Sequence, residues 1–256
     1  MAVIEFSNVS KSFGEGTART DVLKNIDLKV EDGEFLVLLG FSGTGKTTLI
    51  NLMAGLEKPT KGTVTYRGQP IDGPGRERGV IFQNYSLMPW LTVNGNVQLA
   101  VDTVFPGMSR AEKAEKVAHY VKMVGLGHAA TRRPAELSGG MRQRVGLARA
   151  LAVNADVLLM DEPFSAVDEQ TRRKFQEDLL ALVQNEKKTF IFVTHSIEEA
   201  VYVSDQIAIL LPRPSRVSEI IRPSNFRNKG IDNIRRDPEY LDIVDEIWAS
   251  LRTYVE

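Results

Sequence analysis

The nine residues 40–48 read GFSGTGKTT, and they constrain this chain more than any other stretch of its sequence. They match the pattern G-x-x-x-x-G-K-[ST], in which two glycines let the backbone turn so tightly that successive N–H groups point at phosphate oxygens. An apolar run at 35–39 precedes the loop, and a helix-compatible stretch at 47–54 follows it. This order predicts a strand, a phosphate-binding loop and a helix whose N-terminus adds partial positive charge.

The loop brings a charge and a metal ligand to a bound nucleotide. Lys46 is placed to reach the β- and γ-phosphates, and the Thr47 hydroxyl is placed to ligate Mg²⁺. The residues expected to hold the nucleotide at this loop are Gly40, Ser42, Gly43, Thr44, Gly45, Lys46, Thr47 and Thr48.

The composition fits one or two globular units, since 43% of the 256 residues are hydrophobic and 25% are charged. The 32 Lys and Arg residues against 33 Asp and Glu residues leave a formal net charge of −1, which does not favour a general nucleic-acid binder. Cysteine is absent, which excludes disulfides and thiolate metal sites. The N-terminus lacks the pattern of a signal peptide, and the apolar runs are too short for a membrane-spanning helix, so we expect a soluble chain.

Short apolar runs separated by helical patterns predict an α/β fold. Alternating segments near the N-terminus, at 4–9, 26–30 and 63–66, favour a small β-rich edge. Further runs are typical of buried parallel strands and lie at 80–82, 157–160, 190–193 and 207–211.

Residues 86–152 contain no convincing strand, and we expect them to form a helical subdomain within a single domain spanning 1–256. Ser109 and Glu112 form a capping-box pattern that opens a helix to about Val124. Ser138 can cap a second helix, whose apolar stripe consists of Met141, Val145, Ala148 and Ala152.

Residues 212–256 are expected to form a C-terminal extension with an amphipathic helix. Asp237 and Pro238 suit its cap and first turn. Its stripe consists of Tyr240, Val244, Ile247, Trp248, Leu251 and Tyr254. Such a stripe most often packs on its own domain, and the alternative is a partner-binding surface.

Polar side chains follow several of the predicted strands, where α/β sheets bind their ligands. Asp161 suits a water-mediated Mg²⁺ role and Glu162 suits polarising an attacking water; the alternative for this pair is a solvated turn. His195 is expected to contact the γ-phosphate, and Ser196 with Glu199 would cap the next helix. Gln83 is a candidate ligand of Mg²⁺ or water, and Asp168 lies just past the carboxylate pair.

Together with LSGGM at 137–141, these residues resemble the ATP-binding subunits of ABC transporters over about 3–211. The Walker A loop, Q-loop (Gln83), signature LSGGM, Walker B strand (157–161), D-loop (165–168) and H-loop (His195) follow one another in the family's order. The signature separates this family from other P-loop ATPases. The resemblance implies a P-loop core with a parallel-rich sheet, an N-terminal antiparallel β subdomain and an inserted helical signature subdomain. It also implies ATP and Mg²⁺ as cofactors, ATP hydrolysis with Glu162, His195 and Gln83 as catalytic residues, and Thr47, Gln83 and Asp161 as metal ligands.

The resemblance further implies that two ATPase subunits, identical or related, face each other head to tail. Each ATP would lie between one Walker A loop and the partner's signature, so that Ser138, Gly139 and Gly140 serve the partner's nucleotide. Asp168 would join the nucleotide-binding set. Phe13 matches the aromatic that stacks on adenine in this family, and its alternative is a core or edge phenylalanine.

Residues 79–97 and 133–151 look like the branch of the family that serves nitrate, sulfonate, taurine and related oxyanions. That likeness implies an importer subunit at the cytoplasmic face of the inner membrane, with permease subunits as direct partners. A periplasmic or extracellular solute-binding protein would be an indirect partner, and nucleic acid would not be one. Gly95 departs from the family where it meets its permease, which leaves the permease partner open. An exporter, an ATPase of DNA repair or translation, and a cassette that binds ATP without hydrolysing it are the alternatives. The chain shows neither the coiled-coil insertion of the repair proteins nor the second cassette of the translation factors.

Overall fold

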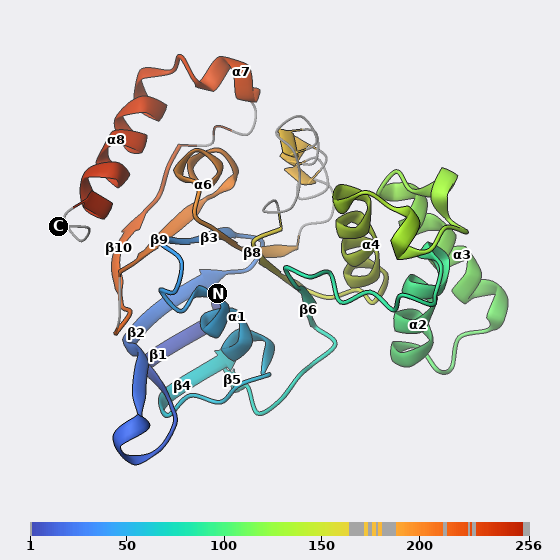
Figure 1. Cartoon of the computed structure of the whole chain (residues 1–256), viewed down its shortest axis with the longest axis horizontal. Coiled ribbons are helices and arrows are strands. Elements are labelled where there is room, and N and C mark those ends of the chain that lie inside the picture. The colour runs from blue at the N-terminus through green and yellow to red at the C-terminus, as the bar shows by residue number, and fades with distance from the viewer. Residues whose placement is uncertain are drawn as a thin grey trace. The chain divides into compact units, whose positions relative to one another are not determined.

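The computed structural model describes most of the chain and divides it into two compact units. The first unit comprises Met1–Pro74 and Lys187–Glu256, and the second comprises Gly75–Glu186. Figure 1 labels the helices and strands of both units. The described residues are 2–163, 172–173, 176–177, 179–180, 188–211, 214–224, 226 and 229–252, without the side chains of Thr17, Ile231 and Asp232.

An antiparallel sheet opens the first unit, in the order β2-β1-β4-β5. Alternation of apolar and polar residues buries one face of its long strands, as in β2, where Ile26, Leu28 and Val30 are buried between exposed residues. The strands are β1 (Ala2–Phe13), β2 (Thr20–Glu31), β4 (Lys61–Tyr66) and β5 (Gln69–Pro70), and a short 3₁₀ turn, η1 (Gly16–Ala18), joins the first two.

A second sheet of the first unit has the order β10-β9-β3-β8. Strand β3 runs parallel to both β8 and β9, whereas β10 pairs antiparallel with β9. Every residue of β3, β8 and β9 is buried, as expected for strands covered on both faces. The strands are β3 (Phe35–Gly40), β8 (Thr189–Thr194), β9 (Gln206–Leu210) and β10 (Val217–Ile221).

Three helices of the first unit, α1, α6 and α8, pack on these strands or on one another. Helices α1 and α6 contact β3, and α8 contacts α6. The Tyr240 ring of α8 lies 5.6 Å from that of Phe226, and burial raises the pKa of Tyr240 to about 12. The helices are α1 (Lys46–Ala54), α6 (Ile197–Val203), α7 (Ile231–Ile234) and α8 (Pro238–Arg252).

Only part of the apolar stripe predicted for α8 is buried. Tyr240, Ile247 and Leu251 are buried, but Trp248 is 46% exposed. Trp248 points away because it lies about 100° around the helix from Ile247, and its ring accepts the Arg252 guanidinium at 5.9 Å instead. Tyr254 lies outside the described residues.

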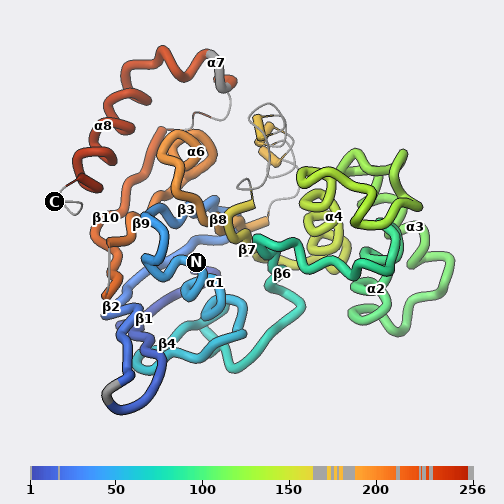
Figure 2. Tube along the Cα trace, in the orientation of Figure 1, coloured from blue at the N-terminus to red at the C-terminus, as the bar shows by residue number. Residues whose placement is uncertain are grey.

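The second unit joins a pair of parallel strands to a group of helices. Strand β6 pairs with β7, and α2, α3 and α4 contact one another, with α4 also packing on β6. Figure 2 traces the chain from β6 into α2. The elements are β6 (Arg78–Ile81), α2 (Val93–Val104), α3 (Arg110–Met123), η2 (Gly127–Ala129), η3 (Pro134–Glu136), α4 (Gly139–Ala152) and β7 (Val157–Asp161).

The local signals for helix starts in this unit are confirmed. Helix α3 begins with the predicted capping box, since the Ser109 hydroxyl accepts from the Glu112 N–H and the Glu112 carboxylate accepts from the Ser109 N–H. Ser138 is the N-cap of α4, whose residues Val145, Ala148 and Ala152 are buried. No pattern predicted α2 or the edge strand β10.

Candidate functional site

The phosphate-binding loop lies between β3 and α1, as the sequence predicts, and its glycines have identifiable reasons. A methyl group on Gly40 would lie 2.7 Å from the Leu210 carbonyl oxygen. Gly45 has φ +79°, and a methyl group there would lie 2.9 Å from Leu23 Cδ2. Gly40 is therefore required by close packing, whereas Gly45 is required by both packing and a left-handed backbone.

The loop holds the Lys46 side chain ready for a phosphate. Lys46 is only 5% exposed, and its ammonium donates to the carbonyl oxygens of Gly40 and Phe41, both at 2.8 Å. The Thr44 hydroxyl donates to the same Phe41 carbonyl at 2.9 Å. A cation fixed over a glycine-rich turn at a helix N-terminus is an anion-binding arrangement. Ser42, Gly43 and Thr47 are exposed beside it, and Thr48 is half-buried.

Gly45→Ala should damage this loop more than the same change at Gly68. Both glycines have φ +79°, so alanine at either position is strained by about 1–2 kcal/mol. Only Gly45 has neighbours within 4 Å of the added methyl, namely Val22 and Leu23. We expect Gly45→Ala to lose more stability in urea unfolding and to bind MgATP more weakly by calorimetry. Equal stability losses with unchanged MgATP affinity in both variants would contradict this account of the loop.

His195 emerges beside the phosphate-binding loop. Leu39 of β3 pairs with Thr194 of β8 in parallel register, so Gly40 at the end of β3 and His195 just after β8 lie at the carboxyl ends of neighbouring strands. His195 is exposed. Thr194, just before it, is buried, and its hydroxyl donates to the Glu199 carboxylate at 2.6 Å.

The N-cap of α6, the helix after His195, has only one of the two hydrogen bonds expected of a capping box. The Ser196 hydroxyl accepts from the Glu199 N–H at 3.3 Å, as expected of an N-cap. The Ser196 N–H, however, donates to the Thr194 hydroxyl at 3.0 Å rather than to Glu199. The Glu199 carboxylate accepts from the buried Thr194 hydroxyl instead.

Phe13 ends β1 and belongs to the surface. Its ring is 40% exposed and has the Lys11 ammonium 4.8 Å from its centroid. That ammonium also pairs with Glu57 at 2.7 Å. The exposed ring excludes the buried-core alternative for Phe13 and leaves an aromatic face available for stacking.

In the second unit, the structure brings Gln83 and the two carboxylates to one end of a strand pair. Ile81 of β6 pairs with Met160 of β7 in parallel register, so Gln83 and Glu162 each lie two residues past that pair. Asp161 is the last residue of β7 and is 6% exposed. Glu162 has φ +44°, a left-handed conformation that is uncommon for a residue other than glycine. Such an outlier at a strand end supports a functional role for the residue, and the sequence did not predict this backbone conformation.

Ser138, Gly139 and Gly140 form the start of α4. The Ser138 hydroxyl accepts from the Met141 N–H at 3.3 Å. The free N–H groups of the first helical turn, together with the helix dipole, favour an anion at this end.

The predicted site residues are therefore divided between the two units. The first unit holds Phe13, the loop from Gly40 to Thr48, and His195; the second holds Gln83, Ser138, Gly139, Gly140, Asp161 and Glu162. Asp168 and the rest of the predicted D-loop lie outside the described residues. The contacts of Val22 and Leu23 with Gly45 were missed, because no local signal marks a partner 22 residues away.

The oxygen donors proposed for Mg²⁺ fit that ion chemically. Thr47 offers a hydroxyl, Asp161 a carboxylate and Gln83 an amide carbonyl, and hard oxygen ligands are what Mg²⁺ prefers. Mg²⁺ also keeps few protein ligands when nucleotide phosphates complete its shell.

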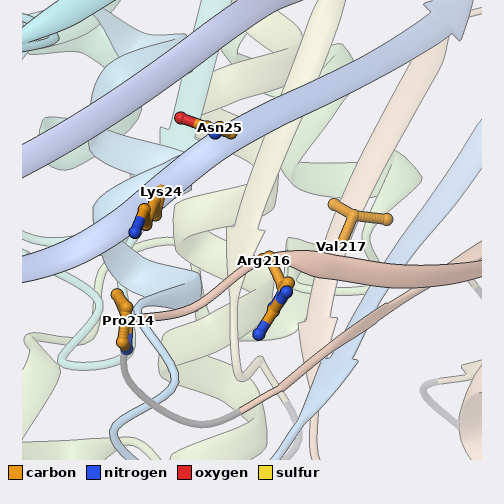
Figure 3. A pocket seen from close by; sticks show the side chains of 5 residues that line it. All are labelled: Lys24, Asn25, Pro214, Arg216 and Val217. Carbon is orange, nitrogen blue, oxygen red and sulfur yellow. The ribbon is translucent and has the colours of Figure 1, made fainter.

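A pocket of about 190 Å³ lies elsewhere in the first unit. Figure 3 shows the side chains that line it, which are Lys24, Asn25, Pro214, Arg216 and Val217. None of them belongs to the predicted nucleotide set. Among the residues that the structure describes, no helix combines the length and apolar character needed to cross a membrane.

A strand, a glycine-rich loop and a helix in an α/β core define a P-loop nucleotide-binding protein. The family model described as "ABC transporter" matches residues 23–165. The chain belongs to the ABC transporter family.

Relatives and solved structures agree with this assignment. The chain is 44% identical over 253 residues to the uncharacterized ABC transporter ATP-binding protein MJ0412 of Methanocaldococcus jannaschii, covering 97% of this chain and 94% of that protein. It is 45% identical over 246 residues to the bicarbonate transport ATP-binding protein CmpC of Synechococcus elongatus, covering 95% of this chain. It is 44% identical over 247 residues to the nitrate import ATP-binding protein NrtC of Synechocystis, covering 90% of this chain. The chain spans only 37% of the length of each of these last two proteins.

The fold is similar to that of a solved ATP-binding cassette. That structure, of the cassette MJ0796 as a dimer in a post-hydrolysis state bound to ADP and Pi, is 33% identical to this chain. The alignment has a TM-score of 0.78 and covers 87% of this chain and 100% of that one. The expected α/β fold, with an antiparallel N-terminal sheet and a parallel-rich core, is thereby confirmed.

Proposed function

We propose that the chain is the ATP-hydrolysing energy subunit of an importer for a small oxyanion. The observation that carries this proposal is the loop at 40–48, where a buried Lys46 ammonium is held at 2.8 Å by two loop carbonyls beside a helix N-terminus. Bicarbonate and nitrate, named for its relatives, are small oxyanions, which supports the solute class.

The first unit binds the nucleotide in this proposal. Lys46 and the loop N–H groups hold the β- and γ-phosphates, and His195 contacts the γ-phosphate. The exposed ring of Phe13 stacks on the adenine. The oxygens of Thr47, Asp161 and Gln83 would hold Mg²⁺, which neutralises phosphate charge when bound.

The second unit supplies the chemistry at the attacking water. Glu162 accepts a hydrogen bond from that water and so raises its nucleophilicity. Gln83, at the same end of the strand pair, orients the water or a metal ligand. Backbone strain at Glu162, with φ +44°, supports a functional role for the position.

Two subunits complete each site in this proposal. Ser138, Gly139 and Gly140 of one subunit face the nucleotide of the other, identical or related, subunit, and Asp168 joins the same site. The cassette spans 1–256, with 86–152 as its helical subdomain and 212–256 as a C-terminal extension. It works at the cytoplasmic face of the membrane with permease subunits. A solute-binding protein delivers the solute to those permease subunits from the other side.

Trp90 is the strongest candidate for contact with the permease. It precedes α2 and is 67% exposed, in a segment that carries Met88, Pro89 and Leu91. A large exposed aromatic ring is typical of an interface anchor.

The test is phosphate release from ATP by the purified chain, alone and assembled with its permease. We expect hydrolysis with Mg²⁺ and none with EDTA. Trp90→Ala should retain the hydrolysis of the isolated chain but lose most of the stimulation by the permease, on the order of thirtyfold, because an anchor contributes about 2 kcal/mol.

Trp248→Ala is the matched control, because Trp248 is the chain's other tryptophan and is also exposed. It should leave both activities unchanged. A chain that hydrolyses no MgATP even with its permease would overturn the proposed function. Equal losses in the two tryptophan variants would overturn only the assignment of Trp90.

A further inference from the structure

Two strained residues follow Gln83 in the second unit. Tyr85 has φ +60° and Ser86 has φ +45°, and neither is a glycine. Left-handed residues of this kind persist only where surrounding contacts hold them. The position of Gln83 therefore depends on the contacts that fix Tyr85 and Ser86.

Arg149 of α4 holds both strained residues through their carbonyl groups. Its Nη1 donates to the Ser86 carbonyl oxygen at 2.7 Å, and its Nη2 donates to the Tyr85 carbonyl oxygen at 3.2 Å. Burial lowers the pKa of Arg149, yet a guanidinium stays charged in proteins. Within the described part of the chain, no carboxylate forms a salt bridge with Arg149, so these two carbonyls are its polar partners.

Residues 83–86 form a segment that we call the Gln83 loop. Arg142 connects this loop to the start of α4. Its guanidinium lies 5.8 Å from the centroid of the Tyr85 ring, and its Nη1 donates to the Leu137 carbonyl oxygen at 3.0 Å. Leu137 directly precedes Ser138. The Tyr85 ring is thus held by a residue that also fixes the entry to the signature helix.

The packing of α4 on β6 explains how this helix both carries the signature residues and contacts the loop that carries Gln83. A methyl group on Gly79 would lie 3.2 Å from Ala150 Cβ, and one on Gly146 would lie 3.5 Å from Ile81 Cγ2. The helix therefore runs antiparallel to β6, and its N-terminal end approaches the end of β6 from which Gln83 emerges (Figure 1). Small residues at 79 and 146 allow this close approach.

We propose that Arg149 is a positioning residue that locks the Gln83 loop to the signature helix, so that the two move as one piece. This inference rests on the proposed function, in which Gln83 serves the chain's own nucleotide and Ser138 serves the partner's. Through Arg149, a movement of Gln83 at one nucleotide site of the dimer would be transmitted to Ser138 at the other site. Arg142 supports it through Tyr85.

Arg149→Lys tests the lock without removing the charge or the aliphatic stem. A lysine ammonium lacks the rigid fork that lets one side chain bridge two carbonyls. We expect kcat for ATP to fall about tenfold while KM changes less than about twofold, because the residue acts on orientation and not on nucleotide binding. Hydrogen exchange of the amides at 83–87 should accelerate in the same variant.

Arg144→Lys is the matched control on the same helix. Arg144 donates to the Val124 carbonyl at 3.3 Å, away from the Gln83 loop. It should change neither kcat nor exchange at 83–87. Equal effects of the two substitutions would assign Arg149 a general role in α4 and overturn the proposal.

A double-mutant cycle with Gln83→Ala separates this inference from the proposed function. If Arg149 acts through Gln83, Arg149→Lys should lower kcat less than about twofold in the Gln83→Ala background. Independent, multiplicative losses would overturn the lock. Wild-type kcat in Gln83→Ala alone would instead contradict the catalytic role proposed for Gln83, whatever Arg149 does.

Discussion

Glu162→Gln should abolish most ATP turnover, by about 100- to 10,000-fold, while the chain still binds MgATP. Glutamine keeps the shape of the side chain and the strained backbone position at the end of β7. It loses the carboxylate that accepts a hydrogen bond, and then a proton, from the attacking water. Because the phosphate contacts belong to Lys46 and its loop, nucleotide affinity should be retained.

Phosphate-release assays, MgATP calorimetry and size-exclusion chromatography with ATP would measure these effects together. We expect the variant to accumulate as a closed dimer with ATP bound, since closure precedes hydrolysis. Glu115→Gln makes the same chemical change on an exposed position of α3 and should behave as the wild type. Turnover at the wild-type rate in Glu162→Gln would remove Glu162 from the mechanism.

The second large effect is complementation between two inactive variants. Lys46→Ala removes the main cation of the phosphate-binding loop, and Ser138→Arg blocks the signature end of α4. Neither variant alone should occlude nucleotide, because every composite site in its dimer is broken. A mixed dimer contains one intact site, formed by the loop of the Ser138 variant and the signature of the Lys46 variant.

Occlusion of labelled ATP, measured in each pure variant and in an equal mixture, tests this geometry. Random pairing makes about half of the dimers mixed with one good site each, so about a quarter of the wild-type occlusion should return. No recovery in a mixture verified to contain mixed dimers, or full occlusion by a monomeric Ser138→Arg chain, would contradict the shared site. If the native partner is a related subunit, that subunit takes the place of one variant in the mixture.

Much of the site could be predicted because its signals are local. A glycine-rich loop between an apolar run and a helix, or carboxylates directly after a buried strand, specify chemistry within a few residues. The parallel register of β3 with β8, and of β6 with β7, then brings His195 to the phosphate-binding loop and Gln83 to Glu162. Both pairings follow from placing strand ends at one edge of a sheet.

The features that escaped prediction depend on contacts distant in sequence. Helix α2 carries Gly95 and several β-branched residues, which are weak helix formers. It forms because Thr92 caps it and because the buried Asn96 amide bonds the main chain at Met88 and Thr92. Arg149 meets Ser86 across 63 residues of sequence, and no periodicity announces such a contact.

The edge strand β10 was missed for a different reason. Its residues alternate between half-buried and exposed, and it pairs with β9 alone. A short strand of this kind lacks the continuous apolar run that marked its neighbours. The left-handed backbone of Glu162 was also beyond sequence reasoning, since glutamate carries no preference for that conformation.

The two carbonyls that hold the Lys46 ammonium also bear on how the site empties. At 2.8 Å each, the Gly40 and Phe41 oxygens solvate the buried ammonium, so its charge is compensated within the loop itself. An arriving phosphate competes with these oxygens, and its net attraction is the difference between the two sets of contacts. The loop therefore moderates its own hold on the nucleotide, which favours departure of the spent product and readies the subunit for another round.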